Sequence, residues 1–146
     1  ADGGLADDGA LVETLRAELS DFQPALVYGP SLEELHPDHR AAAQALCSAC
    51  MRDPRPRLLL YGVNAQVTAN VLIDTTAVFD KKRAAIECFE SQLAYHSMVE
   101  KAEAVDRART VNIDLPEVRF VEGFTDLGER DLARARIAAA PEQSGI

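Results

Sequence analysis

Residues 25–40 read ALVYGPSLEELHPDHR, and the interpretation of the whole chain depends on this stretch. Its apolar first part, which ends at Pro30, predicts a short buried strand of a parallel sheet. Pro37 suits the first turn of a helix, so His36 is predicted to cap that helix and His39 to lie within its first turn. Both imidazoles then lie at one helix entrance, where the positive end of the helix dipole favours neutral histidine.

The histidine pair follows the carboxyl end of the predicted strand, which is the edge where ligands bind in open α/β sheets. Two histidines and Asp38 within four residues suggest part of a metal site, because neutral imidazole is a common metal ligand. A histidine at a helix start is more often a polar cap, and Asp38 equally suits the helix dipole there. A zinc site needs at least three protein ligands, so this stretch supplies only part of one.

On both sides of this stretch the sequence predicts alternating helices and strands, the order of a layered α/β domain. The predicted helices cover residues 10–20, 37–51, 75–96, 97–110 and 131–140. The predicted strands cover residues 25–28, 57–63, 71–74 and 117–124, and a polar loop covers residues 64–70. The helix at 75–96 is expected to bury one stripe, formed by Val78, Ala85, Ile86, Phe89 and Leu93.

The composition narrows the class of protein. A chain of 146 residues that is 47% hydrophobic can build the core of one domain. Its formal net charge of −9 argues against general binding to nucleic acid or to anionic membranes, because both need a basic surface. No apolar run approaches the length of a membrane span, and the first residues lack the pattern of a signal peptide.

The three cysteines do not form a disulfide framework, and we therefore expect a reducing compartment, the cytoplasm. Cys47 and Cys50 form a Cys-x-x-Cys pair in the middle of a predicted helix. We interpret them as small buried residues rather than as half of a redox or zinc site. The third histidine, His96, stands alone and is interpreted as a helix-end residue rather than a ligand.

Five short motifs occur in a fixed order along the chain. They are residues 24–29, residues 36–42 (HPDHRAA), residues 74–76 (DTT), residues 82–92 with their final Ser-Gln, and residues 121–124 (VEGF). In this order and at these intervals, residues 1–127 resemble the carboxyl-terminal two-thirds of a PIG-L/LmbE-like deacetylase. The His-Pro-Asp-His core is fairly specific in this context, whereas the other motifs are individually weak. We therefore expect such a domain part over residues 1–128, followed by a carboxyl-terminal helix and tail over residues 129–146.

The resemblance implies a Rossmann-like α/β fold with a mostly parallel sheet, here incomplete, and a zinc-dependent hydrolase. Such an enzyme removes an acetyl or other acyl group from a small N-acetylglucosamine-type or related amide substrate. It implies that His39 is a zinc ligand and that His36 faces the reacting carbonyl, to stabilise the oxyanion or to protonate the leaving amine. Asp38 is a candidate for orienting a histidine. The other candidates are Asn64 and Gln66 for sugar hydroxyls and Gln92 for a supporting role behind the site, and self-association stays open.

The chain departs from the family pattern in one respect. No Ala-His-Pro-Asp-Asp-Glu motif occurs in it, so two zinc ligands and the general base have no counterpart. This chain alone is therefore expected neither to bind zinc tightly nor to hydrolyse an amide. We expect it to be part of a longer protein that carries the motif, rather than a remnant that has lost the chemistry. The alternatives are a non-catalytic binding domain with a degenerate site, or completion by a second chain that pairs with an exposed apolar sheet edge.

Overall fold

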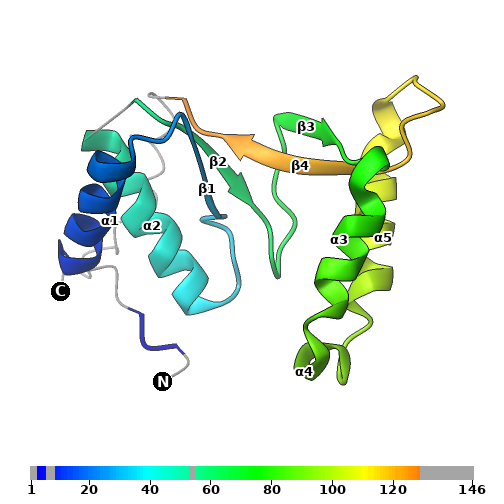
Figure 1. Cartoon of the computed structure of the whole chain (residues 1–146), viewed down its shortest axis with the longest axis horizontal. Helices are drawn as coiled ribbons and strands as arrows, with labels where there is room; N and C mark the ends of the chain where they lie inside the picture. The colour runs from blue at the N-terminus through cyan, green and yellow to red at the C-terminus, as the bar shows by residue number, and fades with distance from the viewer. Residues whose placement is uncertain (1–2, 6–8, 53–54, 129–146) are drawn as a thin grey trace, which may run out of the picture. The chain divides into compact units, whose positions relative to one another are not determined.

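The computed structural model describes residues 3–5, 9–52 and 55–128 (Figure 1). The chain divides into two compact units, Ala1–Asn70 with Phe124–Ile146, and Val71–Gly123. The strands form one sheet in the order β1-β2-β4-β3, and among the described helices none is both long and apolar enough to cross a membrane. The helix predicted at 131–140 and the tail from 129 lie outside the described residues.

The first unit contains α1 (Gly9–Phe22), β1 (Leu26–Pro30), α2 (Pro37–Arg52), β2 (Arg57–Tyr61) and the end of β4 (Val121–Asp126). β1 and β2 are parallel, with Leu26 opposite Arg57 and Pro30 opposite Tyr61. β2 pairs with β4 in the antiparallel direction. These elements agree with the predicted helix, strand, helix, strand order to within a few residues.

The core of the first unit lies where α1 and α2 pack against β1 and β2. Small side chains of α2 allow a close approach, and a Cβ atom on Gly29 of β1 would collide with the side chain of Leu46. Burying each leucine here stabilises the fold by roughly 1.5–3 kcal/mol. The buried core residues are Leu19, Leu46, Cys47, Ala49, Cys50, Leu58 and Leu60, which confirms the interpretation of the two cysteines as small buried residues.

The prediction that the first strand is buried is wrong for Leu26 and Tyr28. Val27 packs against the core and Gly29 lies against α2, whereas Leu26 and Tyr28 are 39% and 50% exposed. Successive side chains of a strand point to opposite faces, and helices cover only one face of β1 within the described residues. β1 is also the first strand in the sheet order, so it is an edge strand of the described sheet.

The second unit contains β3 (Val71–Asp74), η1 (Thr76–Val78), α3 (Phe79–Glu87), α4 (Glu90–Leu93), α5 (Met98–Ala108), η2 (Arg109–Asn112) and the first residues of β4. Figure 1 shows α3 and α5 side by side, and the two helices are in contact. The rings of Phe79 and Phe120 stack with centroids 3.7 Å apart. Lys82 Nζ lies 2.6 Å from a carboxylate oxygen of the buried Asp106 and 2.6 Å from one of Glu122.

Two predicted elements of the second unit need correction. The helix predicted at 75–96 divides into η1, α3 and α4, and Val78 and Phe89 of its expected buried stripe are 47% and 59% exposed. The chain turns after α3, and α5 packs against α3. The spacing of apolar residues along one segment does not report such packing. The strand predicted at 117–124 begins only at Val121, because the backbone N–H groups of Arg119 and Phe120 donate to Thr76 Oγ1 instead.

Candidate functional site

The loop between β1 and α2 is held at both of its ends. The backbone N–H of Ser31 donates to the carbonyl oxygen of Tyr61 at 2.7 Å, which continues the pairing of β1 with β2. At the other end, Arg40 Nη1 donates to the carbonyl oxygens of Glu34 and Leu35 at 2.8 and 2.7 Å. The loop therefore presents the histidines from a fixed backbone at the carboxyl end of two parallel strands.

His36 caps α2, as predicted from the position of Pro37. Its Nδ1 accepts a hydrogen bond from the backbone N–H of Asp38 at 3.2 Å, and its carbonyl oxygen accepts one from the N–H of Arg40 at 3.2 Å. A neutral imidazole that accepts at Nδ1 carries its hydrogen on Nε2. His36 in this form is thus a hydrogen-bond donor at Nε2.

His39 lies in the first turn of α2, also as predicted, and it holds the opposite arrangement of donor and acceptor. Its Nδ1 is 3.1 Å from Oε2 of Glu34, and the two histidine rings have centroids 5.0 Å apart. A carboxylate only accepts hydrogen bonds, so Nδ1 of His39 carries the hydrogen and the lone pair of the neutral ring lies on Nε2. A metal binds histidine through such a lone pair, and a carboxylate on the other nitrogen is its usual partner.

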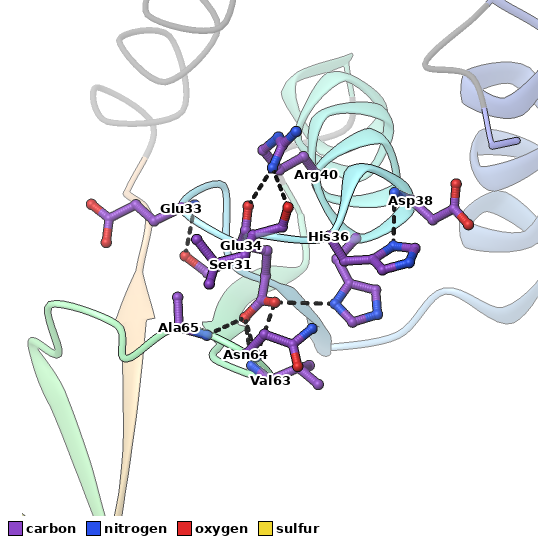
Figure 2. Close-up of polar contacts among 11 residues, drawn as sticks. Ser31, Glu33, Glu34, His36, Asp38, Arg40, Val63, Asn64 and Ala65 are labelled. Carbon is purple, nitrogen blue, oxygen red and sulfur yellow. Dashed lines mark hydrogen bonds and ion pairs between the residues drawn. The ribbon is translucent and has the colours of Figure 1, made fainter. Parts of the chain in front are cut away.

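Glu34 is the residue that the sequence analysis missed. Only 1% of it is exposed, and Figure 2 shows its carboxylate pointing toward the backbone of the loop after β2. The backbone N–H groups of Val63, Asn64 and Ala65 all donate to it, those of Asn64 and Ala65 at 3.0 and 3.3 Å. Burial raises the pKa of this carboxyl, but the hydrogen bonds from this loop and from His39 outweigh it and lower the pKa overall.

A glycine makes the loop after β2 possible. A Cβ atom on Gly62 would collide with the carbonyl oxygen of Ala65, so the tight turn that follows β2 requires this residue. The turn directs three successive N–H groups toward one point, which Glu34 occupies. In the sequence Glu33 and Glu34 are equivalent neighbours, and only this loop distinguishes them, because Glu33 is exposed.

The carboxylate of Asp38 holds the backbone of residues 3–5. It accepts hydrogen bonds from the backbone N–H groups of Gly3 and Leu5, both at 2.8 Å. The bond from Leu5, then that from Gly3, lowers the pKa of Asp38, and the two nearby histidines act in the same direction. This contact gives Asp38 a structural role beside the histidines, and its role in catalysis stays a prediction.

The remaining candidate residues are exposed. Asn64 and Gln66 lie on the loop after β2, and Glu34 fixes the backbone of Asn64 near His39. Gln92 lies on α4 in the second unit, where its carbonyl oxygen accepts hydrogen bonds from the backbone N–H groups of Tyr95 and His96. His96 follows α4 in the link to α5. The roles proposed for the two amides on the loop and for Gln92 stay predictions.

The described residues fit a metal ion only in part. The contact of Nδ1 with Glu34 leaves the lone pair of a neutral His39 ring on Nε2, which could serve as a single ligand. Within residues 3–5, 9–52 and 55–128, no group of three or more His, Cys, Asp or Glu side chains could hold a metal. Any complete metal site at His39 would therefore need ligands from outside these residues.

Three solved structures share this fold over most of the chain. The conserved protein TT1542 from Thermus thermophilus is 26% identical, with a TM-score of 0.74 over 85% of this chain and 61% of its own. The α/β, Rossmann-like fold class is confirmed, with one parallel and one antiparallel strand pairing in the described sheet. An N,N'-diacetylchitobiose deacetylase from Pyrococcus horikoshii in complex with an inhibitor is 19% identical, with a TM-score of 0.70 over 88% of this chain and 55% of its own. GalB, the 4-carboxy-2-hydroxymuconate hydratase from Pseudomonas putida KT2440, is 20% identical, with a TM-score of 0.58 over 82% of this chain and 59% of its own.

The chain spans only 55% to 61% of the lengths of the three proteins, and it has their mixed α/β, Rossmann-like architecture in incomplete form. No protein-family model matches the sequence, and no curated protein matches it either.

Proposed function

We propose that this chain is part of a zinc-dependent hydrolase of the PIG-L/LmbE type, which removes an acetyl or other acyl group from an N-acetylglucosamine-type or related small amide. The observation that carries the proposal is the pairing of His39 Nδ1 with buried Glu34 at the carboxyl end of two parallel strands. This pairing prepares Nε2 for a metal ion. The fold shared with a diacetylchitobiose deacetylase supports it, and the remaining ligands and the general base would come from outside this chain.

The two histidines would have different roles. His39 would hold the zinc ion through Nε2, and the bound ion would act as a Lewis acid toward the acyl carbonyl and make water more acidic. His36 would donate a hydrogen bond from Nε2 to the acyl oxygen or would pass a proton to the leaving amine. Asp38 would keep the backbone of residues 3–5 beside them. Asn64 and Gln66 would contact sugar hydroxyls, and Gln92 keeps the supporting role that the resemblance implies.

The first test is the zinc content of the full-length native protein, measured by elemental analysis. We expect about one zinc ion per chain, as one catalytic site requires. His39→Ala should remove it, whereas His36→Ala should keep the zinc and lose hydrolysis of N-acetyl sugars by about 100-fold or more. Zinc that survives the loss of His39 would contradict the proposal.

A second candidate function is a non-catalytic binding domain with a degenerate site. The absence of a three-ligand group from the described residues favours it, and the hydratase neighbour shows that this fold is not confined to deacetylases. This alternative predicts no zinc in the full-length protein and no hydrolysis, together with retained binding of N-acetyl sugars in calorimetry.

A further inference from the structure

We propose that Glu34 is a positioning residue that fixes the tautomer of His39 and joins this histidine to the loop of residues 63–65. Binding of a metal at His39 would then be coupled to the conformation of the loop that carries Asn64. The inference deepens the proposed function and rests on it, because it takes His39 as the metal ligand.

The first step is that both oxygens of Glu34 act as acceptors. Oε1 accepts hydrogen bonds from the backbone N–H groups of Val63, Asn64 and Ala65, at 3.1 Å from Asn64 and 3.3 Å from Ala65. Oε2 accepts a hydrogen bond from Asn64 N–H at 3.0 Å and faces Nδ1 of His39 at 3.1 Å. Backbone N–H groups can only donate, so the carboxylate is held as an acceptor and His39 must donate to it.

The second step is that Glu34 has no room to reorient. Glu34 is 1% exposed, and Arg40 Nη1 donates hydrogen bonds to the carbonyl oxygens of Glu34 and Leu35. The position of a ligating histidine and the nitrogen that carries its hydrogen are set by the bond on its other nitrogen. Glu34 therefore holds the lone pair of His39 on Nε2 even before a metal arrives.

The third step concerns the loop. The same carboxylate binds three successive N–H groups of residues 63–65 and the ring of His39. A shift of the His39 ring upon metal binding would therefore act on the loop through Glu34. The exposed Asn64 side chain, which is the candidate for substrate contact, sits on this loop. Glu34 thus links the metal ligand to the loop proposed to select the substrate.

The test is Glu34→Gln in the full-length native protein. A glutamine keeps one oxygen for the loop but presents an NH2 group to Nδ1 of His39, so that two donors would face each other. His39 is then expected to move its hydrogen to Nε2, the nitrogen that should bind zinc. Competition for zinc with a chromophoric chelator should show an affinity about 10–100-fold lower than in the unmodified protein. Nitrogen-15 NMR of the metal-free variant should show His39 as the Nε2–H tautomer.

Glu33→Gln is the matched control, because it removes the same charge from the exposed neighbouring residue. Its zinc affinity and its His39 tautomer should equal those of the unmodified protein. The tautomer of the unmodified metal-free protein is a second measurement that does not depend on folding of the Glu34 variant. An Nδ1–H tautomer supports the inference, and an Nε2–H tautomer overturns it.

The outcomes also separate this inference from the proposed function. If His39→Ala removes zinc but Glu34→Gln changes neither zinc affinity nor tautomer, the proposed function stands and the role of Glu34 is wrong. If zinc persists in His39→Ala, the proposed function fails, and with it the coupling of Glu34 to a metal.

Discussion

Among the residues that the structure describes, two acidic side chains are almost fully buried, and their surroundings shift their pKa values in opposite directions. Glu34 in the first unit and Asp106 in the second unit are each 1% exposed. For both carboxyls burial is the largest influence, and it raises the pKa. The pKa of Glu34 is nevertheless lowered, whereas that of Asp106 is raised.

The difference comes from the donors. Glu34 has three backbone N–H groups and an imidazole, all fixed by the fold. Asp106 depends mainly on Lys82, which it shares with a second carboxylate, Glu122, while Arg109 is more distant at 3.7 Å. Several fixed donors outweigh the cost of burying a charge, but one shared flexible donor does not. The histidine loop is therefore built around a stable anion, which agrees with the role proposed for Glu34 in positioning His39.

The largest effect on stability is expected from Glu34→Ala, because this variant removes the buried anion of the first unit. The variant leaves the donors of residues 63–65 and of His39 without their acceptor. We expect the free energy of unfolding to fall by about 2–4 kcal/mol in chemical denaturation. Glu33→Ala should change it by less than about 0.5 kcal/mol, as is usual for an exposed residue. Equal effects of the two variants would mean that the N–H donors do not stabilise the fold through Glu34.

Gly62→Ala should have an intermediate effect, because it displaces the donors and leaves the carboxylate in place. The new Cβ atom would collide with the carbonyl oxygen of Ala65, and the free energy of unfolding should fall by about 1–3 kcal/mol. The pKa of Glu34, measured by NMR titration, should rise, because burial would then outweigh the remaining hydrogen bonds, as it does for Asp106. Gly128→Ala is the control, since a Cβ atom there meets nothing within 4 Å. An unchanged pKa of Glu34 in Gly62→Ala would show that the turn does not set the donor positions.

The smallest effect, on the order of 1 kcal/mol for each unit of pKa shift, is expected in the pH dependence of stability. The lowered pKa of Glu34 stabilises the fold at pH values above 4.5, the ordinary pKa of a glutamate. This stabilisation is lost as the pH falls through 4.5 and then through the lower pKa in the folded protein. The raised pKa of Asp106 does the opposite, because its contribution is present below its ordinary value of 3.8 and is lost as the pH rises through the higher value in the folded protein.

These signs can be measured with Glu34→Gln and Asp106→Asn. Between pH 7 and pH 3 the unfolding free energy of Glu34→Gln should approach that of the unmodified protein, since the advantage of the anion disappears. Over the same range the unfolding free energy of Asp106→Asn should fall relative to that of the unmodified protein. The unmodified fold is stabilised as Asp106 becomes protonated. Parallel curves for the two variants would contradict the opposite shifts of the two carboxyls.

Two predicted elements differ from the structure for the reason that also hid Glu34, which is contact with residues distant in the sequence. The region 75–96, predicted as one helix, is interrupted by a turn after α3, and α3 and α5 pack together. Lys82 thereby contacts Asp106, which is 24 residues away in the sequence. The strand at 117–124 began late because Thr76 binds the backbone of residues 119 and 120. Helical periodicity and apolar runs describe neighbours along the chain, so they do not report such partners.

The sequence by itself determined the features that depend on neighbouring residues. Pro37 sets the start of α2, so His36 caps it and His39 lies in its first turn. Apolar runs placed β1, β2 and β3 to within a few residues. Only the tertiary structure decided which of two adjacent glutamates would be buried and would bind His39. That choice depends on a turn at Gly62 that brings N–H groups 29 to 31 residues distant onto one carboxylate, and chain folding alone creates that proximity.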